Sequence, residues 1–332
     1  LAEAMHVPVA TSLNARDAIV DNNPLSVGVV GTYSRRSANQ VVAEADLVIF
    51  VGTRAGGMTT HFWTIPAKGT STIQIDIDPL VNGRNYPTDV SIVGDARVTL
   101  EKMNELNIPV PKERVEWLKQ VKAICTSYKI DFKEVYESDA YPIRPERIVN
   151  ELSNGMPKNA VIVVDTGHSG MWMGGMFEKR HEGQSYIRSA GHLGWAFPAA
   201  LGAKCGAPHR PVVCFMGDLG FWYHMAEVET AVRAGINTIT IINNNNSGNM
   251  AKGSISAIYD DQPTKESQDI WVQNKINFAK IAENMGAVGI RVEKANEIAP
   301  AFQKALKLDK PVVIDIATDI EIVAPKAWEP KA

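Results

Sequence analysis

The sequence has few of the features that mark specialised protein classes. It contains only three cysteines, Cys125, Cys205 and Cys214, and they are spaced neither as zinc ligands nor as a disulfide framework. The net charge is -3 and no basic stripe occurs, which argues against a nucleic-acid partner. No apolar run approaches the ~20 residues that a membrane span needs. We therefore expect a globular protein in a reducing, cytoplasmic setting, with no nucleic-acid or membrane partner.

The chain also lacks a clear beginning. It starts at Leu1 in LAEAM, which reads as the last turns of a helix without an N-cap or the start of a periodic pattern. The segment is too short and too acidic for a signal peptide. Either an initiator segment was trimmed or an upstream domain is missing, and we expect the second.

The sequence does contain a regular alternation of short apolar runs and helical patterns. Runs rich in Val and Ile predict strands at 8–13, 46–52, 71–77, 160–165, 211–218, 238–244 and 311–317. They are nearly continuous, as in strands that are buried on both faces of a parallel sheet. Helical patterns occur at 15–21, 37–45, 113–130, 145–153, 221–235 and 296–308. This alternation predicts the α/β class with parallel sheets.

The pattern is interrupted between residues 104 and 145. NELNIPVPKE (104–113) has two prolines and few apolar anchors, and DAYPIRPER (139–147) starts a new series of elements. We expect one domain at 1–110, a helical linker at 111–140 and a second domain at 141–332.

The strongest chemical signal is at the ends of two predicted strands. PVVCFMGDLGF ends its apolar run at Gly217-Asp218, and the following strand ends in four asparagines, 243–246. Ligands of open α/β sheets bind beyond the carboxyl ends of strands, often at helix N-termini. Asp218 and an asparagine would therefore lie at one edge of the sheet.

A carboxylate, an amide oxygen and a backbone carbonyl are ligands that Mg²⁺ accepts, and they leave room for substrate phosphate oxygens. We interpret this edge as a magnesium site that ties a diphosphate to the protein. The alternative for the asparagines is a turn with left-handed residues and capping bonds.

Taken together, GDLGF, EVETAVRAG and INNNNSGNM resemble the cofactor signature of thiamine diphosphate-dependent enzymes, which is GDG, an interval, and NN. PERIVNELSNGMPKNAVIVVDTGHSGMW and SAGHLGWAFPAALGAK resemble further parts of the family's diphosphate-binding domain. Residues 1–103, with ADLVIFVGTR, IQIDIDP and VGDA, look like its central domain. The resemblance covers essentially the whole chain and is closest to the acetolactate synthase-like branch. It implies two three-layer α/β/α domains, a Rossmann-like central domain and a thiamine diphosphate-binding domain.

The resemblance also implies roles for single residues. The metal ligands fall on Asp218, on Asn245, which lies 27 residues later, and on the backbone carbonyl of Ser247. Asn244 competes for the amide role, and Leu219 departs from the glycine of GDG. The implied cofactor-binding set is Gly167, His168, Ser169, Gly191, His192, Leu193, Gly217, Asp218, Leu219, Gly220, Asn245, Ser247 and Met250.

The turn at Gly167, His168 and Ser169 follows a predicted strand and offers backbone N–H groups and a hydroxyl to the diphosphate. The alternative is an ordinary strand-to-helix turn, with His168 as a capping residue.

Four implied contacts concern the rest of the cofactor and the substrate. Leu193 falls where the family places an apolar wedge beneath the cofactor, and the carbonyl of Gly191 would accept from its aminopyrimidine. Met250 lies where a family side chain approaches the reactive carbon. His192 is either a substrate contact or a buried, satisfied histidine.

The implied reaction is decarboxylation of a 2-oxo acid, followed by release of an aldehyde or by carboligation. The cofactor carries the difficult step. The family activates it with a glutamate from an N-terminal pyrimidine-binding domain, and nothing in this sequence matches that glutamate. We therefore expect no catalytic residue in this chain, which alone should hold Mg²⁺ and diphosphate without catalysing. The pyrimidine-binding domain would come from a missing segment or from another chain.

Three functions stay open: an acetolactate synthase-like lyase and carboligase; a 2-oxo acid decarboxylase or 2-hydroxyacyl-CoA lyase; and a non-catalytic cofactor-binding homologue. Because family members build the site between two subunits, we expect a homodimer or homotetramer. FAD or an adenine nucleotide is an open assignment for the first domain, where GTRAGGMTTHFW differs from the family's flavin-type pattern. Asp76 and Asp78 at a strand end would contact a ribose or simply cap that end.

Overall fold

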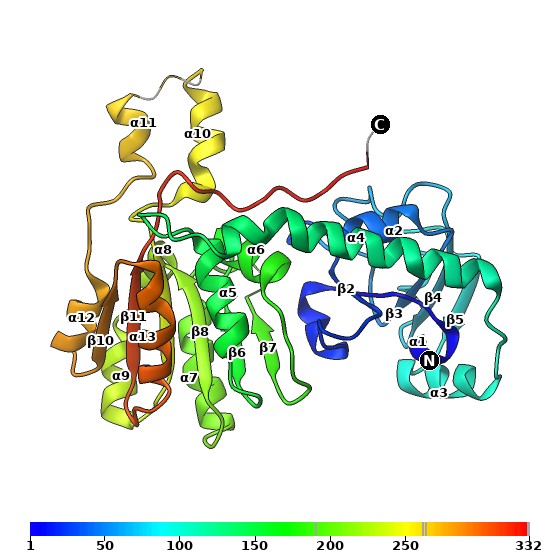
Figure 1. Cartoon of the computed structure of the whole chain (residues 1–332), viewed down its shortest axis with the longest axis horizontal. Helices are drawn as coiled ribbons and strands as arrows, with labels where there is room; N and C mark the ends of the chain where they lie inside the picture. Colours follow the sequence, from blue (N-terminus) through cyan, green and yellow to red (C-terminus); the bar gives the residue numbers. More distant parts are fainter. Residues whose placement is uncertain (190, 261, 263, 331–332) are drawn as a thin grey trace. The chain divides into compact units, whose positions relative to one another are not determined.

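The computed structural model describes residues 1–189, 191–260, 262 and 264–330. The chain divides into two compact units, Leu1–Phe132 and Lys133–Pro325, and the segment from Lys326 belongs with the first unit (Figure 1). In both units every pairing within the described sheets is parallel. The predicted α/β class with parallel sheets is therefore confirmed.

The first unit contains two small parallel sheets. β1 (Val9–Thr11) pairs with β2 (Ser26–Val29), and β3 (Leu47–Val51), β4 (Ser71–Asp76) and β5 (Val90–Val93) form the second sheet. The helices are α1 (Ala2–Met5), α2 (Arg36–Glu44), α3 (Ala96–Glu105) and the long α4 (Lys112–Tyr136). A small apolar core joins β2, α2 and α4 through Val27, Ala38, Val41 and Val121.

The helix predicted at 15–21 is wrong. The chain there forms a short 3-10 helix, η1 (Leu13–Ala18), with non-helical dihedral angles at Ala15. Its buried residue Arg16 forms an ion pair with Asp21 at 2.7 Å, and Arg35 contacts the same carboxylate at 3.0 Å. A buried ion pair, rather than an apolar helical stripe, sets the local conformation.

The second unit is built on one six-stranded parallel sheet in the order β10-β11-β9-β8-β6-β7 (Figure 1). Its strands are β6 (Val161–Val164), β7 (Ser185–Arg188), β8 (Val212–Gly217), β9 (Ile239–Asn244), β10 (Val288–Val292) and β11 (Val312–Ala317). β6, β8, β9 and β11 are buried along almost their whole length. This burial explains their continuous apolar sequences, because both faces of the sheet are covered.

Helices cover the two faces of this sheet. One face packs against α7 (Ala196–Gly206), α8 (Asp218–His224), α9 (Glu227–Ala234) and α12 (Phe278–Asn284), whose apolar side chains share a core with Cys214 of β8. α5 (Pro145–Gly155), α6 (Gly167–Met176) and α13 (Ile298–Ala305) pack together as a second helical layer. α10 (Lys252–Ile258) and α11 (Lys265–Asp269) stand away from the sheet in Figure 1.

The single helix predicted at 221–235 is two helices, α8 and α9. The linking residues Met225 and Ala226 keep right-handed helical dihedral angles. Their carbonyl oxygens accept from the backbone N–H groups of Val228 and Glu229, three residues on. The tighter i→i+3 bonding interrupts the α-helix without reversing the chain.

None of the helices described combines the length and apolar character needed to cross a bilayer.

Candidate functional site

The predicted site residues gather at the carboxyl edge of the sheet in the second unit. β6, β8 and β9 are neighbours and run parallel, so their carboxyl ends lie at one edge. Thr166 and Gly167 lead from β6 into α6, Gly217 leads from β8 into α8, and the asparagine run ends β9. Ligands of open α/β sheets bind at this edge.

Asp218 is the first residue of α8, and it is only 2% exposed. Its carboxylate accepts from its neighbour Leu219 N–H at 2.6 Å and from Ser247 N–H at 3.1 Å. Burial raises the pKa of Asp218 to about 6, against the effect of the N–H donors, and the nearby Asp315 carboxylate raises it further. Within the described residues the partners of the Asp218 carboxylate are backbone N–H groups, and no basic side chain forms an ion pair with it.

Asn244, the last residue of β9, is fully engaged by the protein. Its amide nitrogen donates to Asp315 Oδ1 at 2.8 Å and to the carbonyl of Ile276 at 2.9 Å. Asp315 is buried in β11, where it also accepts from Phe278 N–H at 2.7 Å and forms an ion pair with Arg291 at 2.7 Å. Asn244 Oδ1, the atom of this amide that could bind a metal, accepts from Asn246 N–H at 3.2 Å, so the choice of Asn245 over Asn244 as the ligand stays a prediction.

Asn245 and Asn246 face different partners. Asn246 has the left-handed φ of 55°, and its Oδ1 accepts from Ile276 N–H at 3.0 Å. Asn245 is buried, and its Oδ1 accepts from the Ser247 hydroxyl at 2.9 Å. Since Ser247 N–H bonds Asp218, the structure brings Asp218, Asn245 and Ser247 together.

These three residues fit a hard cation. A carboxylate with neutral oxygen ligands suits Mg²⁺, which prefers oxygen and keeps positions for phosphate and water. Within the described residues no three His, Cys, Asp or Glu side chains cluster as metal ligands, so no ligand set for a softer metal such as zinc is found there.

Leu219, which departs from the glycine of GDG, is accommodated by Gly248. A Cβ on Gly248 would lie 3.1 Å from Leu219 Cδ2, so the leucine packs where Gly248 has no side chain. A Cβ on Gly220 would lie 2.3 Å from Asp165 Oδ2. The position that must be glycine in GDLG is therefore Gly220.

Asp165 ties the loop before α7 to this edge. Its Oδ2 accepts from Gly194 N–H at 2.8 Å, and burial raises its pKa. Leu193 Cδ1 would be 3.4 Å from a Cβ on Gly220, which places Leu193 against the first turn of α8. Gly191 has the left-handed φ of 110° that this loop requires.

His192 lies in the same loop and is exposed. Its backbone N–H donates to Ser189 Oγ at 2.9 Å, and Ser189 Oγ donates to the His192 carbonyl at 2.7 Å. The interpretation of His192 as a buried, satisfied histidine is therefore wrong.

The turn after β6 contacts residues that follow both β8 and β9. Ser169 Oγ would lie 3.5 Å from a Cβ on Gly217, and Gly167 has a φ of 69° with open space where a Cβ would point. His168 Nδ1 lies 2.8 Å from Asn249 Oδ1, and burial lowers the pKa of His168. Met250 follows in η2 (Asn249–Ala251) and is 51% exposed.

Three residues of this edge, Asp165, Asp315 and Asn249, are not among the predicted site residues. A usable signal exists for Asp315, because one carboxylate in the apolar run PVVIDIA must have partners if the strand is buried. Asp165 ends a similar run. Asn249 gives no such signal, since its partners are set by the path of the chain at Ile320 and Ile322.

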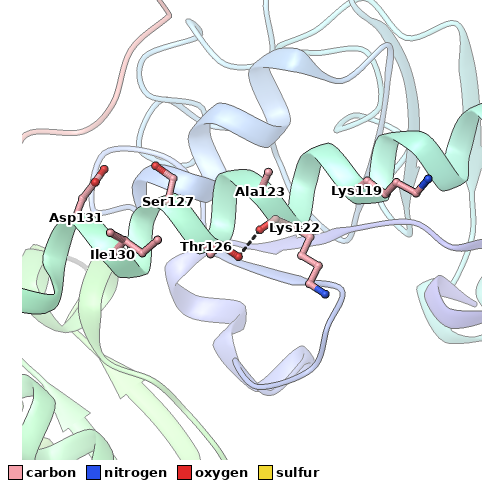
Figure 2. A pocket seen from close by; sticks show the side chains of 7 residues that line it. All are labelled: Lys119, Lys122, Ala123, Thr126, Ser127, Ile130 and Asp131. Atoms are coloured by element: carbon pink, nitrogen blue, oxygen red, sulfur yellow. Dashed lines mark hydrogen bonds between the residues drawn. The ribbon is translucent and has the colours of Figure 1, made fainter.

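The first unit has a hollow of about 470 Å³ beside α4 (Figure 2). Its lining residues all come from that helix: Lys119, Lys122, Ala123, Thr126, Ser127, Ile130 and Asp131. The Thr126 hydroxyl is used within the helix, where it donates to the Lys122 carbonyl at 2.8 Å. Polar groups from separate elements do not converge in this lining, as they do at the edge of the second sheet.

Models of two protein-domain families match this chain. Residues 165–316 match the family described as "Thiamine pyrophosphate enzyme, C-terminal TPP binding domain". Residues 1–103 match "Thiamine pyrophosphate enzyme, central domain". Thiamine pyrophosphate is another name for thiamine diphosphate. The first match contains every residue discussed above from Asp165 to Asp315.

Individual relatives agree with these matches. A probable acetolactate synthase large subunit of Methanococcus aeolicus is 32% identical over 96% of this chain and 55% of its own length. A second, from Methanocaldococcus jannaschii, is 29% identical over 96% of this chain and 54% of its own length. A putative thiamine pyrophosphate-containing protein of Bacillus subtilis is 31% identical over 95% and 53%. The chain spans about half the length of these curated relatives.

Proposed function

The chain belongs to the thiamine pyrophosphate-dependent enzymes, and on that premise we propose that it binds thiamine diphosphate with Mg²⁺ for C–C bond cleavage or carboligation of a 2-oxo acid. The acetolactate synthase large subunits among its relatives support this type of reaction. The observation that carries the proposal is the hydrogen bond between Asp218 and Ser247, with Asn245 bonded to the same serine.

Each residue of the edge has a part in binding. Asp218, Asn245 and the carbonyl of Ser247 would hold Mg²⁺, whose positive charge would favour binding of the diphosphate. The backbone N–H groups at the start of α6, from Gly167 to Ser169, complete the anion site, because a helix N-terminus carries partial positive charge.

Three further groups orient the rest of the cofactor. Leu193, which packs against the first turn of α8, forms the apolar support beneath it. The carbonyl of Gly191 would accept from the aminopyrimidine, and the exposed side chain of Met250 would be available to the substrate. When bound, thiamine diphosphate supplies the nucleophilic carbon that reacts with the 2-oxo acid carbonyl.

No residue of this chain is proposed to activate the cofactor. We assign that role to the glutamate of a pyrimidine-binding domain, supplied by further sequence or by another chain in a homodimer or homotetramer. Without it the chain binds the cofactor and does not turn over.

Two other functions use the same site. A 2-oxo acid decarboxylase or 2-hydroxyacyl-CoA lyase needs the same Mg²⁺ and diphosphate ligands, and a non-catalytic homologue would keep binding alone. Products formed from pyruvate by the chain together with its pyrimidine-binding domain separate them. Acetolactate indicates carboligation, acetaldehyde alone indicates decarboxylation, and no product with intact binding indicates the non-catalytic homologue.

Calorimetric titration of the chain with thiamine diphosphate, with and without Mg²⁺, tests the binding proposal. We expect binding that requires Mg²⁺ and is lost on adding a chelator. Equal affinity with and without the metal, or no binding under either condition, would contradict the proposed site.

A further inference from the structure

The hydrogen bond between His168 and Asn249 has only one arrangement of its proton. The amide nitrogen of Asn249 faces the backbone carbonyls of Ile322 at 3.2 Å and Ile320 at 3.4 Å. Carbonyl oxygens only accept, so the amide nitrogen must lie on that side and Oδ1 must face His168. An amide oxygen also only accepts, so the proton between the two side chains belongs to His168 Nδ1.

The ring of His168 is neutral in the free protein at pH 7.5 and above, because its pKa lies below the ordinary 6.5. Burial lowers the pKa of His168, and only the hydrogen bond to Asn249 acts against it. The charged groups beyond Asn249, Lys252 of α10 and Glu321, pair with each other. The aromatic neighbour on α6 is Trp172, whose ring meets the imidazole edge-on with centroids 5.5 Å apart. A neutral ring with its proton on Nδ1 has a bare lone pair on Nε2.

This tautomer conflicts with a passive role at a diphosphate. His168 lies in the first turn of α6, between Gly167 and Ser169, and its Nδ1 is already used. Nε2 is the ring nitrogen left for a ligand. In this tautomer Nε2 carries a lone pair and can only accept a hydrogen bond, and phosphate oxygens can also only accept, so the two would repel each other. The contact becomes attractive only when Nε2 gains a proton, which turns it into a charge-assisted donor.

We propose that His168 is a proton-accepting residue of the site, held by Asn249 as the Nδ1–H tautomer and protonated on Nε2 when the diphosphate binds. The proton comes from solvent, the neutral imidazole becomes imidazolium, and no covalent bond changes. Asn249 is the positioning residue, because it acts on the ligand only through His168. This inference rests on the proposed function, since it needs a diphosphate at the turn.

The tautomer is tested first, in the free full chain, by nitrogen-15 NMR of the histidine side chains at pH 7.5. We expect His168 to show a protonated Nδ1 and an unprotonated Nε2. Asn249→Ala should release this constraint and give a mixture of tautomers. A wild-type His168 with its proton on Nε2 would overturn the inference without bearing on cofactor binding.

Proton uptake is tested by calorimetric titration with thiamine diphosphate and Mg²⁺ in buffers of different ionisation enthalpy. The wild type should take up protons on binding at pH 7.5, up to one per cofactor, and its affinity should fall as the pH rises. His168→Gln keeps a donor near the Nε2 position without titrating, so its uptake should be near zero. Asn249→Ala should also take up less, because an Nε2–H tautomer donates without a new proton.

His209→Gln is the control, since His209 is exposed and precedes β8 at the opposite edge of the sheet, and it should match the wild type. Magnesium-dependent binding with the same proton count in wild type and His168→Gln would overturn the inference and leave the proposed function intact. Absence of binding in the wild type would overturn both.

Discussion

Two aspartates in equivalent places show what makes a strand end into a site. Asp76 ends β4 in the first unit, and Asp218 follows β8 in the second, each at the carboxyl edge of a parallel sheet. Asp76 accepts from Asp78 N–H at 3.0 Å, and Asp78 in turn accepts from Leu80 N–H at 2.9 Å. Asp76 and Asp78 thus each cap their own turn, and a ribose contact at these carboxylates stays a prediction.

Asp218 differs in its burial and in the origin of its second partner. Its 2% exposed carboxylate reaches the Ser247 N–H, which belongs to the loop after the neighbouring strand. Two adjacent strands therefore present their loops to each other at this edge. A carboxylate at the end of a strand is not enough for a site, and convergence with a second loop is the additional requirement.

The largest expected effect comes from Asp218→Ala. Removing the only charged ligand should weaken magnesium-dependent binding of thiamine diphosphate by at least ~100-fold, more than the ~10–100-fold typical for residues outside the ligand set. Calorimetric titration with saturating Mg²⁺ measures the change. Binding that is unaffected would reject the assignment of Asp218 as a ligand and remove its distinction from Asp76.

A smaller effect is expected within the asparagine run. Asn245→Ala removes a neutral ligand and should weaken the same binding by at least ~10-fold. Asn246→Ala should cost less affinity, because its side chain bonds Ile276 and not the metal loop. Asn246→Ala should mainly lower the free energy of unfolding, by about 1 kcal/mol for the lost hydrogen bond. The reverse order of affinities would show that the ligand register is wrong.

The raised pKa of Asp218 predicts that the metal-free protein loses stability as the pH rises. The ordinary value is 3.8 and the folded value is about 6. Well below pH 3.8 the group is protonated in both folded and unfolded chains. As the pH rises to 6 only the unfolded chain loses the proton, so stability is lost across that window.

Asp218→Asn should remove this loss. A shift of roughly two pKa units sets an upper limit near 3 kcal/mol, and we expect on the order of 2 kcal/mol. The free energy of unfolding in urea, measured between pH 4 and 7 without Mg²⁺, gives the comparison with wild type. If the free energy of unfolding changed with pH in the same way in both proteins, the assignment of a buried, unpaired charge to Asp218 would be contradicted.

The smallest effect is expected from Asp76→Ala in the first unit. One partly exposed turn hydrogen bond is lost, so the free energy of unfolding should fall by less than ~1 kcal/mol and thiamine diphosphate affinity should be unchanged. A loss of cofactor affinity in this variant would remove the contrast between the two strand ends.

The strands that sequence reasoning predicted are those with continuous Val and Ile runs, such as β6, β8 and β11. It missed β2, β5, β7 and β10, which are short or partly exposed and lack that pattern. β5 has mostly exposed residues, and β7 keeps only one fully buried position. These strands are defined by their pairing with a neighbouring strand, and that pairing leaves no pattern in the local sequence.

The sequence alone determined the class of fold, because strands that are buried on both faces need apolar runs. It also determined the residues at the carboxyl edge, because the turns from strand to helix there use glycine and polar residues. It did not determine what each asparagine does. Only the tertiary structure assigns Asn244 to Asp315, Asn246 to Ile276 and Asn249 to His168, while Asn245 remains beside Ser247. The physical reason is that a hydrogen bond depends on which groups lie within bonding distance, and residues far away in the sequence, such as 276, 315 and 320–322, supply them.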